Sequence, residues 1–77
     1  MKKPVIVIGL GEMGSVFARG FLKAGYSVIP VNRDTDVAKL ALEAAEPELV
    51  LVAVAEKDLP STLENLPSSW NEKAVLL

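Results

Sequence analysis

Apolar residues are distributed along this chain in two ways, as short unbroken runs and as longer stretches with helical spacing. The short runs cover residues 5–8, 27–31, 49–55 and 74–77, and each is predicted to form a β-strand. Between the first two runs, apolar residues recur on one helical face, which consists of Met13, Val16, Phe17, Phe21 and Leu22. Two shorter helices are predicted over residues 37–45 and 59–66, so strands and helices alternate along the chain.

The run 49–55 is apolar at every position. Continuous hydrophobicity of this kind is typical of a strand that is covered on both faces, as in a parallel sheet between layers of helices. With the alternating order of elements, it predicts an α/β fold, a partial doubly wound (Rossmann) parallel sheet. Residues 1–77 are then the first half of a doubly wound domain, and the apolar strand at the end of the chain indicates truncation after strand four.

Numbered along the chain, the strands are expected in the spatial order 3-2-1-4. The switch point, at which ligands bind, would lie between strands one and four. Pro30 does not fit this arrangement, because strand two would be central and a proline removes one hydrogen bond of the ladder.

Local signals set the expected ends of the helices. Gly25 stands where a left-handed C-cap would end the first helix. The three residues 34–36 are all candidates for the N-cap of the second helix. Asp58 is expected to cap the third helix, with Pro60 in its first turn. Residues 67–69 are predicted to form a loop.

The first strand leads directly into a glycine-rich hexad, whose members are Gly9, Leu10, Gly11, Glu12, Met13 and Gly14. Gly9 permits a tight turn, Gly11 lets the backbone approach a pyrophosphate, and Gly14 lets the helix pack close to the strand. The helix start offers unpaired amides to a phosphate, and Glu12 is interpreted as a first-turn residue that acts through its backbone amide. With this motif, residues 1–77 are predicted to be the first half of a dinucleotide-binding domain. The alternative is a strand-turn-helix unit without a ligand.

The end of the second strand bears on which dinucleotide is bound. A fingerprint that selects NAD has an acidic residue there, ~20 residues after the glycines. This chain has Asn32 followed by Arg33, an amide and a guanidinium that favour a 2′-phosphate, so NADP is predicted over NAD. Asp34 argues in the opposite direction, because its carboxylate is close enough to pair with Arg33. A solvated strand-end charge is the simpler alternative for Arg33.

Composition narrows the chemistry. The 77 residues contain no cysteine, which removes a disulfide framework and a thiolate metal site, and no histidine, the commonest general base. A formal net charge of −2 argues against a nucleic-acid partner, and no stretch approaches the ~20 apolar residues of a membrane span. A cytoplasmic location is expected. No metal ligand and no catalytic residue is predicted, and Tyr26 and Trp70 are interpreted as packing residues.

The hexad and the end of the second strand resemble the N-terminal domain of the 6-phosphogluconate and 3-hydroxyacid dehydrogenase superfamily, and ketopantoate reductases are similar. In that superfamily, the pattern G-L-G-x-M-G followed by a strand ending in Asn-Arg-Thr marks NADP binding. This chain matches the pattern at Gly9, Leu10, Gly11, Met13, Gly14, Asn32 and Arg33. Asp34 stands in place of the threonine. The resemblance also implies that Val54 and Ala55 contact the cofactor, although strand core explains both equally well, and Ala55 stands where ketopantoate reductases carry a lysine.

The resemblance implies the NADP-binding portion of an oxidoreductase that transfers a hydride between a nicotinamide cofactor and a small hydroxy or keto acid. Substrate-binding and catalytic residues then belong to a mostly helical second domain outside these 77 residues. A homodimer of the full-length protein is compatible with this interpretation. The alternative is a non-catalytic nucleotide-sensing or scaffold domain that uses the same glycine turn.

Overall fold

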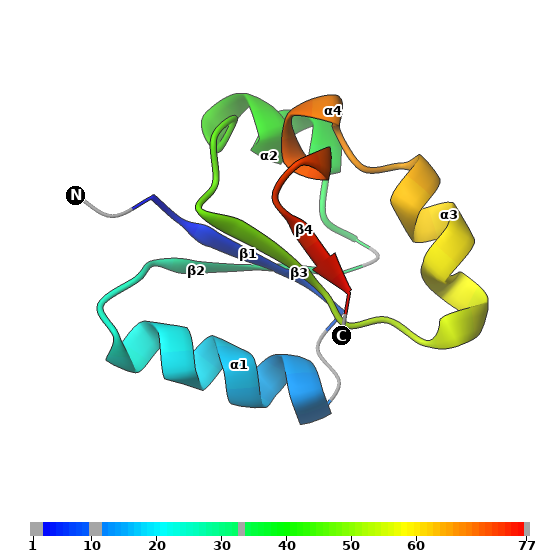
Figure 1. Ribbon diagram of the computed structural model, residues 1–77. Helices are drawn as coiled ribbons and strands as arrows, with labels where there is room; N and C mark the ends of the chain where they lie inside the picture. The colour runs from blue at the N-terminus through cyan, green and yellow to red at the C-terminus, as the bar shows by residue number, and fades with distance from the viewer. Residues whose placement is uncertain (1–2, 10–11, 33, 77) are drawn as a thin grey trace.

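The computed structural model describes residues 3–9, 12–32 and 34–76, and within them the chain forms four parallel strands with helices on both faces (Figure 1). The strands are β1 (Val5–Ile8), β2 (Val28–Val31), β3 (Leu49–Val52) and β4 (Ala74–Leu76). The helices are α1 (Glu12–Lys23), α2 (Val37–Glu43), α3 (Leu59–Glu64) and α4 (Ser68–Asn71), with a 3-10 turn, η1 (Glu56–Asp58), before α3. The predicted α/β class and parallel sheet are confirmed.

The strand order differs from the predicted order 3-2-1-4. β1 pairs with β2 on one side and with β3 on the other, and β4 pairs with β3, so the described strands follow the order β2-β1-β3-β4. The chain moves from β1 outwards to β2 and then crosses back over β1 to β3. The switch point therefore lies between β1 and β3, and its predicted place between strands one and four was wrong. The same order results when the outermost strand of a 3-2-1-4-5 sheet is missing.

Pro30 supplies a physical reason for the position of β2 at the edge of the described sheet. The amides of Val5 and Gly9 in the β1 segment donate to the carbonyl oxygens of Ser27 and Val31, at 2.8 and 3.1 Å. Because alternate residues of a parallel strand address the same neighbour, position 30 directs its backbone nitrogen away from β1. A further strand on that side would find no N–H at Pro30, which suits an edge strand and not a central one.

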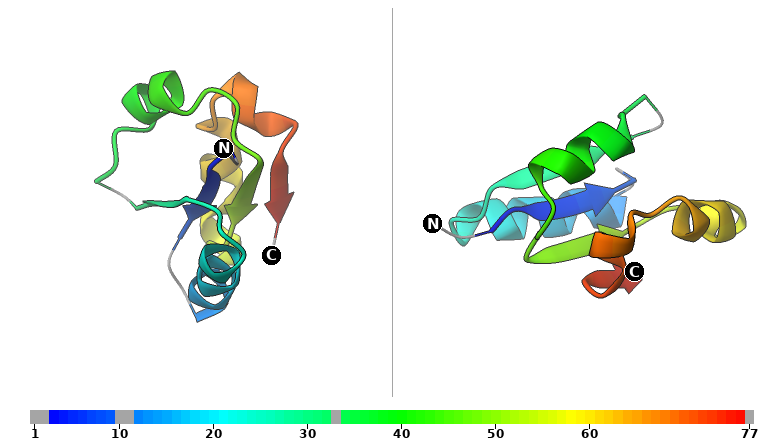
Figure 2. Two further views of the ribbon diagram at one scale, coloured as in Figure 1. Left: turned by 90° about the vertical axis from the view of Figure 1, so that its left-hand side faces the viewer. Right: turned by 90° about the horizontal axis from the view of Figure 1, so that it is seen from above.

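β1 and β3 form the centre of a core with two faces. The side chains directed towards α2, α3 and α4 are Ile6, Ile8, Val50 and Val52. The side chains on the opposite face, towards α1, are Val5, Val7 and Leu51. Figure 2 shows α1 on one side of the sheet and α2 and α4 on the other. All seven side chains are buried, so the predicted burial of these strands on both faces is confirmed.

α1 packs on the sheet through a narrower face than predicted. Ala18 and Phe21 contact the core and Gly14 is buried. Gly14 and Ala18 lie four residues apart and therefore on one face, where their small size lets the helix axis approach the strands. Three other members of the predicted face consequently lie beside or away from the contact and are exposed: Val16, Phe17 and Leu22.

The predicted loop over residues 67–69 is wrong, because α4 begins at Ser68. The amide of Trp70 donates to the carbonyl of Pro67 at 2.9 Å, which closes the turn. The Trp70 side chain is fully buried, and its indole Nε1 donates to the carbonyl of Ala44 at 2.9 Å. Its interpretation as a packing residue is confirmed. None of the described helices is long and apolar enough to cross a membrane.

Candidate functional site

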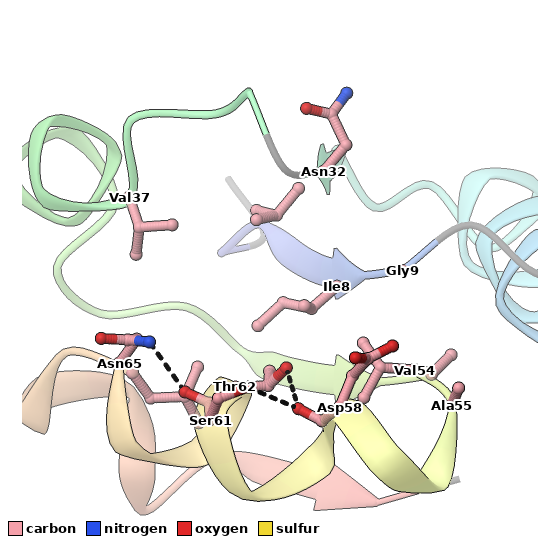
Figure 3. A pocket seen from close by; sticks show the side chains of 13 residues that line it. Ile8, Gly9, Asn32, Val37, Val54, Ala55, Asp58, Ser61, Thr62 and Asn65 are labelled. Atoms are coloured by element: carbon pink, nitrogen blue, oxygen red, sulfur yellow. Dashed lines mark hydrogen bonds between the residues drawn. The ribbon is translucent and has the colours of Figure 1, made fainter.

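A pocket of about 640 Å³ lies at the carboxyl ends of β1, β2 and β3 (Figure 3). Its volume falls within the roughly 300–1,000 Å³ that is usual for small-molecule sites, and this edge of an open α/β sheet is where ligands bind. The strands and the residues directly after them contribute Ile8, Gly9, Val31, Asn32 and residues 53–55. The opposite wall comes from α2 and from the segment that contains α3, with Val37, Asp58, Ser61, Thr62, Asn65 and Leu66.

The turn after β1 is built on Gly9, which has a φ of 83°. This is the left-handed region that disfavours residues with a side chain. A Cβ atom at this position would lie 2.5 Å from the carbonyl oxygen of Ala53 and 3.0 Å from Cγ1 of Val54. The predicted tight turn is confirmed, and it lies directly against the chain that leaves β3.

Gly14 lets the first turn of α1 pack directly on the loop at Gly9. A Cβ atom here would lie 2.7 Å from the carbonyl oxygen of Gly9 and 3.3 Å from Cβ of Ala53. The predicted close packing of helix and strand is confirmed. The first amides of a helix have no partner within it. The start of α1, held beside this turn, can therefore bind an anion. Glu12 and Met13 begin α1, whereas Leu10 and Gly11 lie outside the described residues.

Asn32 lies on the rim of the pocket, directly after β2. Its Oδ1 accepts hydrogen bonds from the amide of Asp34 at 2.8 Å and from the hydroxyl of Thr35 at 3.2 Å. The backbone amide of Asn32 donates to Oγ1 of Thr35 at 3.1 Å. These bonds orient the side chain, because only oxygen can accept from the Asp34 amide, and they leave Nδ2 as a donor without a partner among the described residues. Arg33, the other residue predicted to select NADP, lies outside them.

The caps of the two helices beside the pocket differ from each other. Among the three candidates at residues 34–36, Asp36 is the N-cap of α2 and accepts from the amide of Lys39 at 3.1 Å. Asp58 occupies the predicted N-cap position of α3, with Pro60 in the first turn, but its backbone angles are helical and its side chain makes no capping hydrogen bond. The helical turn begins earlier, after Ala55. The Asp58 carboxylate therefore has no structural partner among the described residues.

The structure brings together four of the residues predicted to bind the cofactor, since Gly9, Asn32, Val54 and Ala55 all line the pocket. The polar residues of the α3 wall were missed. They occur at the spacing i, i+3, i+4 and i+7, which places them on one helical face, and they are Asp58, Ser61, Thr62 and Asn65. In the sequence, this pattern is the same as that of a solvated helix face.

A parallel sheet, a glycine turn at the end of β1 and a pocket at the switch point define a nucleotide-binding domain of the Rossmann type. Residues 4–72 match the family described as the NAD binding domain of 6-phosphogluconate dehydrogenase, and the chain belongs to this family. The cofactor of this domain is therefore a nicotinamide dinucleotide. Among the described residues, no group of His, Cys, Asp or Glu is arranged to hold a metal ion.

Two dehydrogenases and one reductase are similar to this chain. The mitochondrial 3-hydroxyisobutyrate dehydrogenase of Mus musculus is 37% identical over 70 residues, which cover 91% of this chain and 21% of the relative, and that of Rattus norvegicus matches equally well. The glutamyl-tRNA reductase of Campylobacter jejuni is 38% identical over 71 residues, which cover 92% of this chain and 14% of the reductase. The chain thus spans about a fifth of the length of the dehydrogenases it matches. No solved structure is a significant match.

Proposed function

We propose that this chain is the NADP-binding portion of an oxidoreductase that transfers a hydride between nicotinamide and a small hydroxy or keto acid. The observation that carries the proposal is the mutual packing of Gly9, Gly14 and Ala53. A Cβ atom added at Gly9 would lie 2.5 Å from the carbonyl oxygen of Ala53, and one added at Gly14 would lie 2.7 Å from the carbonyl oxygen of Gly9. This packing places the start of α1 beside the mouth of the pocket. A diphosphate held at the helix start and an adenosine in the pocket are then parts of one continuous site.

In this proposal, the chain's own residues bind and orient the cofactor. The backbone from Gly9 to Gly14, including Leu10, Gly11, Glu12 and Met13, holds the diphosphate. Asn32 and Arg33 contact the adenosine ribose and its 2′-phosphate, and Val54 and Ala55 border the cofactor where the chain leaves β3. The bound dinucleotide supplies the hydride chemistry. The groups that bind the substrate and move its proton are proposed to lie in a further domain of the complete protein.

The choice of NADP is supported by the donor on the rim of the pocket. An acid at the end of β2 would accept from ribose hydroxyls and repel a phosphate, whereas Asn32 presents a neutral Nδ2 donor whose orientation is set by Asp34 and Thr35. A 2′-phosphate offers only acceptors. The neighbouring guanidinium of Arg33 adds the charge that binds it most strongly.

NADPH is expected to bind more tightly than NADH, and Arg33→Ala is expected to narrow the difference by about tenfold or more, because a charge-assisted hydrogen bond to the phosphate is lost. Titration of both nucleotides against each protein measures the two dissociation constants. Arg19→Ala, which removes an exposed arginine from α1, is the matched control and should leave the preference unchanged. Equal affinities of the unmodified protein for NADPH and NADH would contradict the assignment of NADP.

The substrate class is supported by the two 3-hydroxyisobutyrate dehydrogenases. The matching reductase is named for a different substrate, so the feature common to all three relatives is the cofactor domain. With NADP⁺, the complete protein is expected to oxidise one or more small hydroxy acids, which the formation of reduced nicotinamide records. Tight cofactor binding without turnover of any small hydroxy acid would contradict this substrate class and favour a non-catalytic, nucleotide-sensing domain.

A further inference from the structure

We infer that the α3 wall of the pocket recognises the exocyclic amino group of the adenine base. The inference rests on the proposed dinucleotide function and deepens it, because it assigns a part of the ligand to residues that the glycine motif does not include. These residues are Asp58, Ser61, Thr62 and Asn65, which all line the pocket.

The hydroxyl donors of this wall and one N–H of Asn65 are already used within the helical segment. The hydroxyls of Ser61 and Thr62 both donate to the carbonyl oxygen of Asp58, at 3.1 and 2.8 Å. Nδ2 of Asn65 donates to the carbonyl oxygen of Ser61 at 2.8 Å. The charged form of Asp58 has no donor at all. What the four side chains still offer to a ligand is therefore mainly a row of acceptors, namely a carboxylate, two hydroxyl oxygens and an amide oxygen, beside the second N–H of Asn65.

A wall on which acceptors predominate, with the carboxylate of Asp58 among them, binds groups that donate and disfavours groups that only accept. The amino group of adenine has two N–H donors, whereas a phosphate has none and carries a negative charge that the Asp58 carboxylate repels. The donor of Asn32 lies on the other rim, so the two sides of the pocket have opposite hydrogen-bonding character (Figure 3). The phosphate is accordingly assigned to the β2 side and the base edge to α3.

The space between the two sides suits a flat ring. Ile8 is buried, Val37 and Leu66 are half-buried, and all three line the pocket with apolar atoms. Apolar walls with a few polar groups that set the orientation are the usual composition of a small-molecule site. An adenine held between these side chains would turn its amino edge towards the acceptors of α3.

The test compares two ligands that differ at this group. Nicotinamide hypoxanthine dinucleotide phosphate has a carbonyl oxygen in place of the adenine amino group and a hydrogen on N1. The unmodified chain is expected to bind it about tenfold more weakly than the adenine form, because a carbonyl oxygen replaces two N–H donors opposite the acceptors and only the single N1–H is gained, at the neighbouring ring position. Asp58→Asn is expected to reduce this preference to a few-fold, since the amide supplies a donor to the carbonyl. The Asp58 side chain makes no capping hydrogen bond, so Asp58→Asn removes no such bond from the folded protein.

Glu64→Gln is the matched control. It removes the same charge from α3, the helix that follows Asp58, at an exposed residue outside the pocket lining, and it should leave the preference unchanged. Equal binding of the adenine and hypoxanthine forms would overturn the inference and assign the acceptors to ribose hydroxyls, while the proposed function would stand. A preference that Asp58→Asn and Glu64→Gln reduce equally would overturn it as well. Binding of neither dinucleotide would contradict the proposed function itself.

Discussion

Replacing Gly9 by valine is expected to abolish dinucleotide binding and to lower the free energy of unfolding by about 2–5 kcal/mol. The positive φ places any Cβ in a strained backbone conformation, and that Cβ would lie 2.5 Å from the carbonyl oxygen of Ala53. Neither group can move freely, because the amide of Ala53 donates to the carbonyl of Ile8 at 2.8 Å. The turn must therefore separate from the end of β3. Denaturant unfolding and NADPH titration measure the two effects.

Gly20→Ala is the control for this change. Gly20 is an exposed residue in the middle of α1, and a Cβ atom there would meet nothing within 4 Å. Alanine is expected to stabilise the domain by about 0.5–1 kcal/mol, because it favours the helix and restricts the unfolded chain. If Gly9→Val and Gly20→Ala had similar effects on stability, the turn after β1 would not be packed against β3 as described.

Trp70→Ala is expected to cost about 3–5 kcal/mol of stability, which is a large part of the ~4–12 kcal/mol usual for a domain of this size. Trp70 is the largest fully buried side chain of the described residues. Its ring packs in the core beneath the face of the sheet that α2 covers, and its Nε1 reaches the carbonyl of Ala44 just after α2. Loss of the indole would both leave a cavity and remove the hydrogen bond that joins α4 to the end of α2. The midpoint of denaturant unfolding measures the effect.

Two further variants separate the contributions of Trp70. Trp70→Phe keeps an aromatic ring but leaves the carbonyl of Ala44 without its donor, so a loss of about 1–3 kcal/mol is expected. Leu42→Ala removes an apolar side chain that is 86% exposed on α2, and its effect should stay within about 0.5 kcal/mol. A Trp70→Ala protein as stable as Leu42→Ala would show that the indole does not hold α4 in place.

Several parts of this fold follow from short stretches of sequence. β1 has the predicted bounds, because a run of β-branched residues that ends at a glycine leaves little choice of conformation or of end point. The turn at Gly9 and the close approach at Gly14 were also predicted, since both depend on the absence of a Cβ atom. The end of α1 at Gly25 is similarly local, with the amide of Tyr26 bonded to the carbonyl of Phe21 at 3.0 Å.

Other features depended on which segments meet. The strand order predicted from the sequence was wrong, because an apolar run shows that a strand is buried but not which strands lie next to it. Pro30 indicated that β2 is an edge strand, because proline has no N–H for a second neighbour. Its significance became clear only once the register with β1 was known. The exposed face of α1 has the same origin, because the approach at Gly14 decides which side chains contact the sheet.

The amino-acid sequence by itself determined the class of fold, the glycine turn and the family, because these depend on local conformation and on periodic burial. Only the tertiary structure decided that β3 lies beside β1 and that α3 directs its polar face into the pocket. The reason is that strand pairing and the orientation of a helix are set by contacts between distant segments. The hydrogen bonds that occupy the hydroxyl donors of the α3 wall are visible only when the donors and their carbonyl partners are placed together in space.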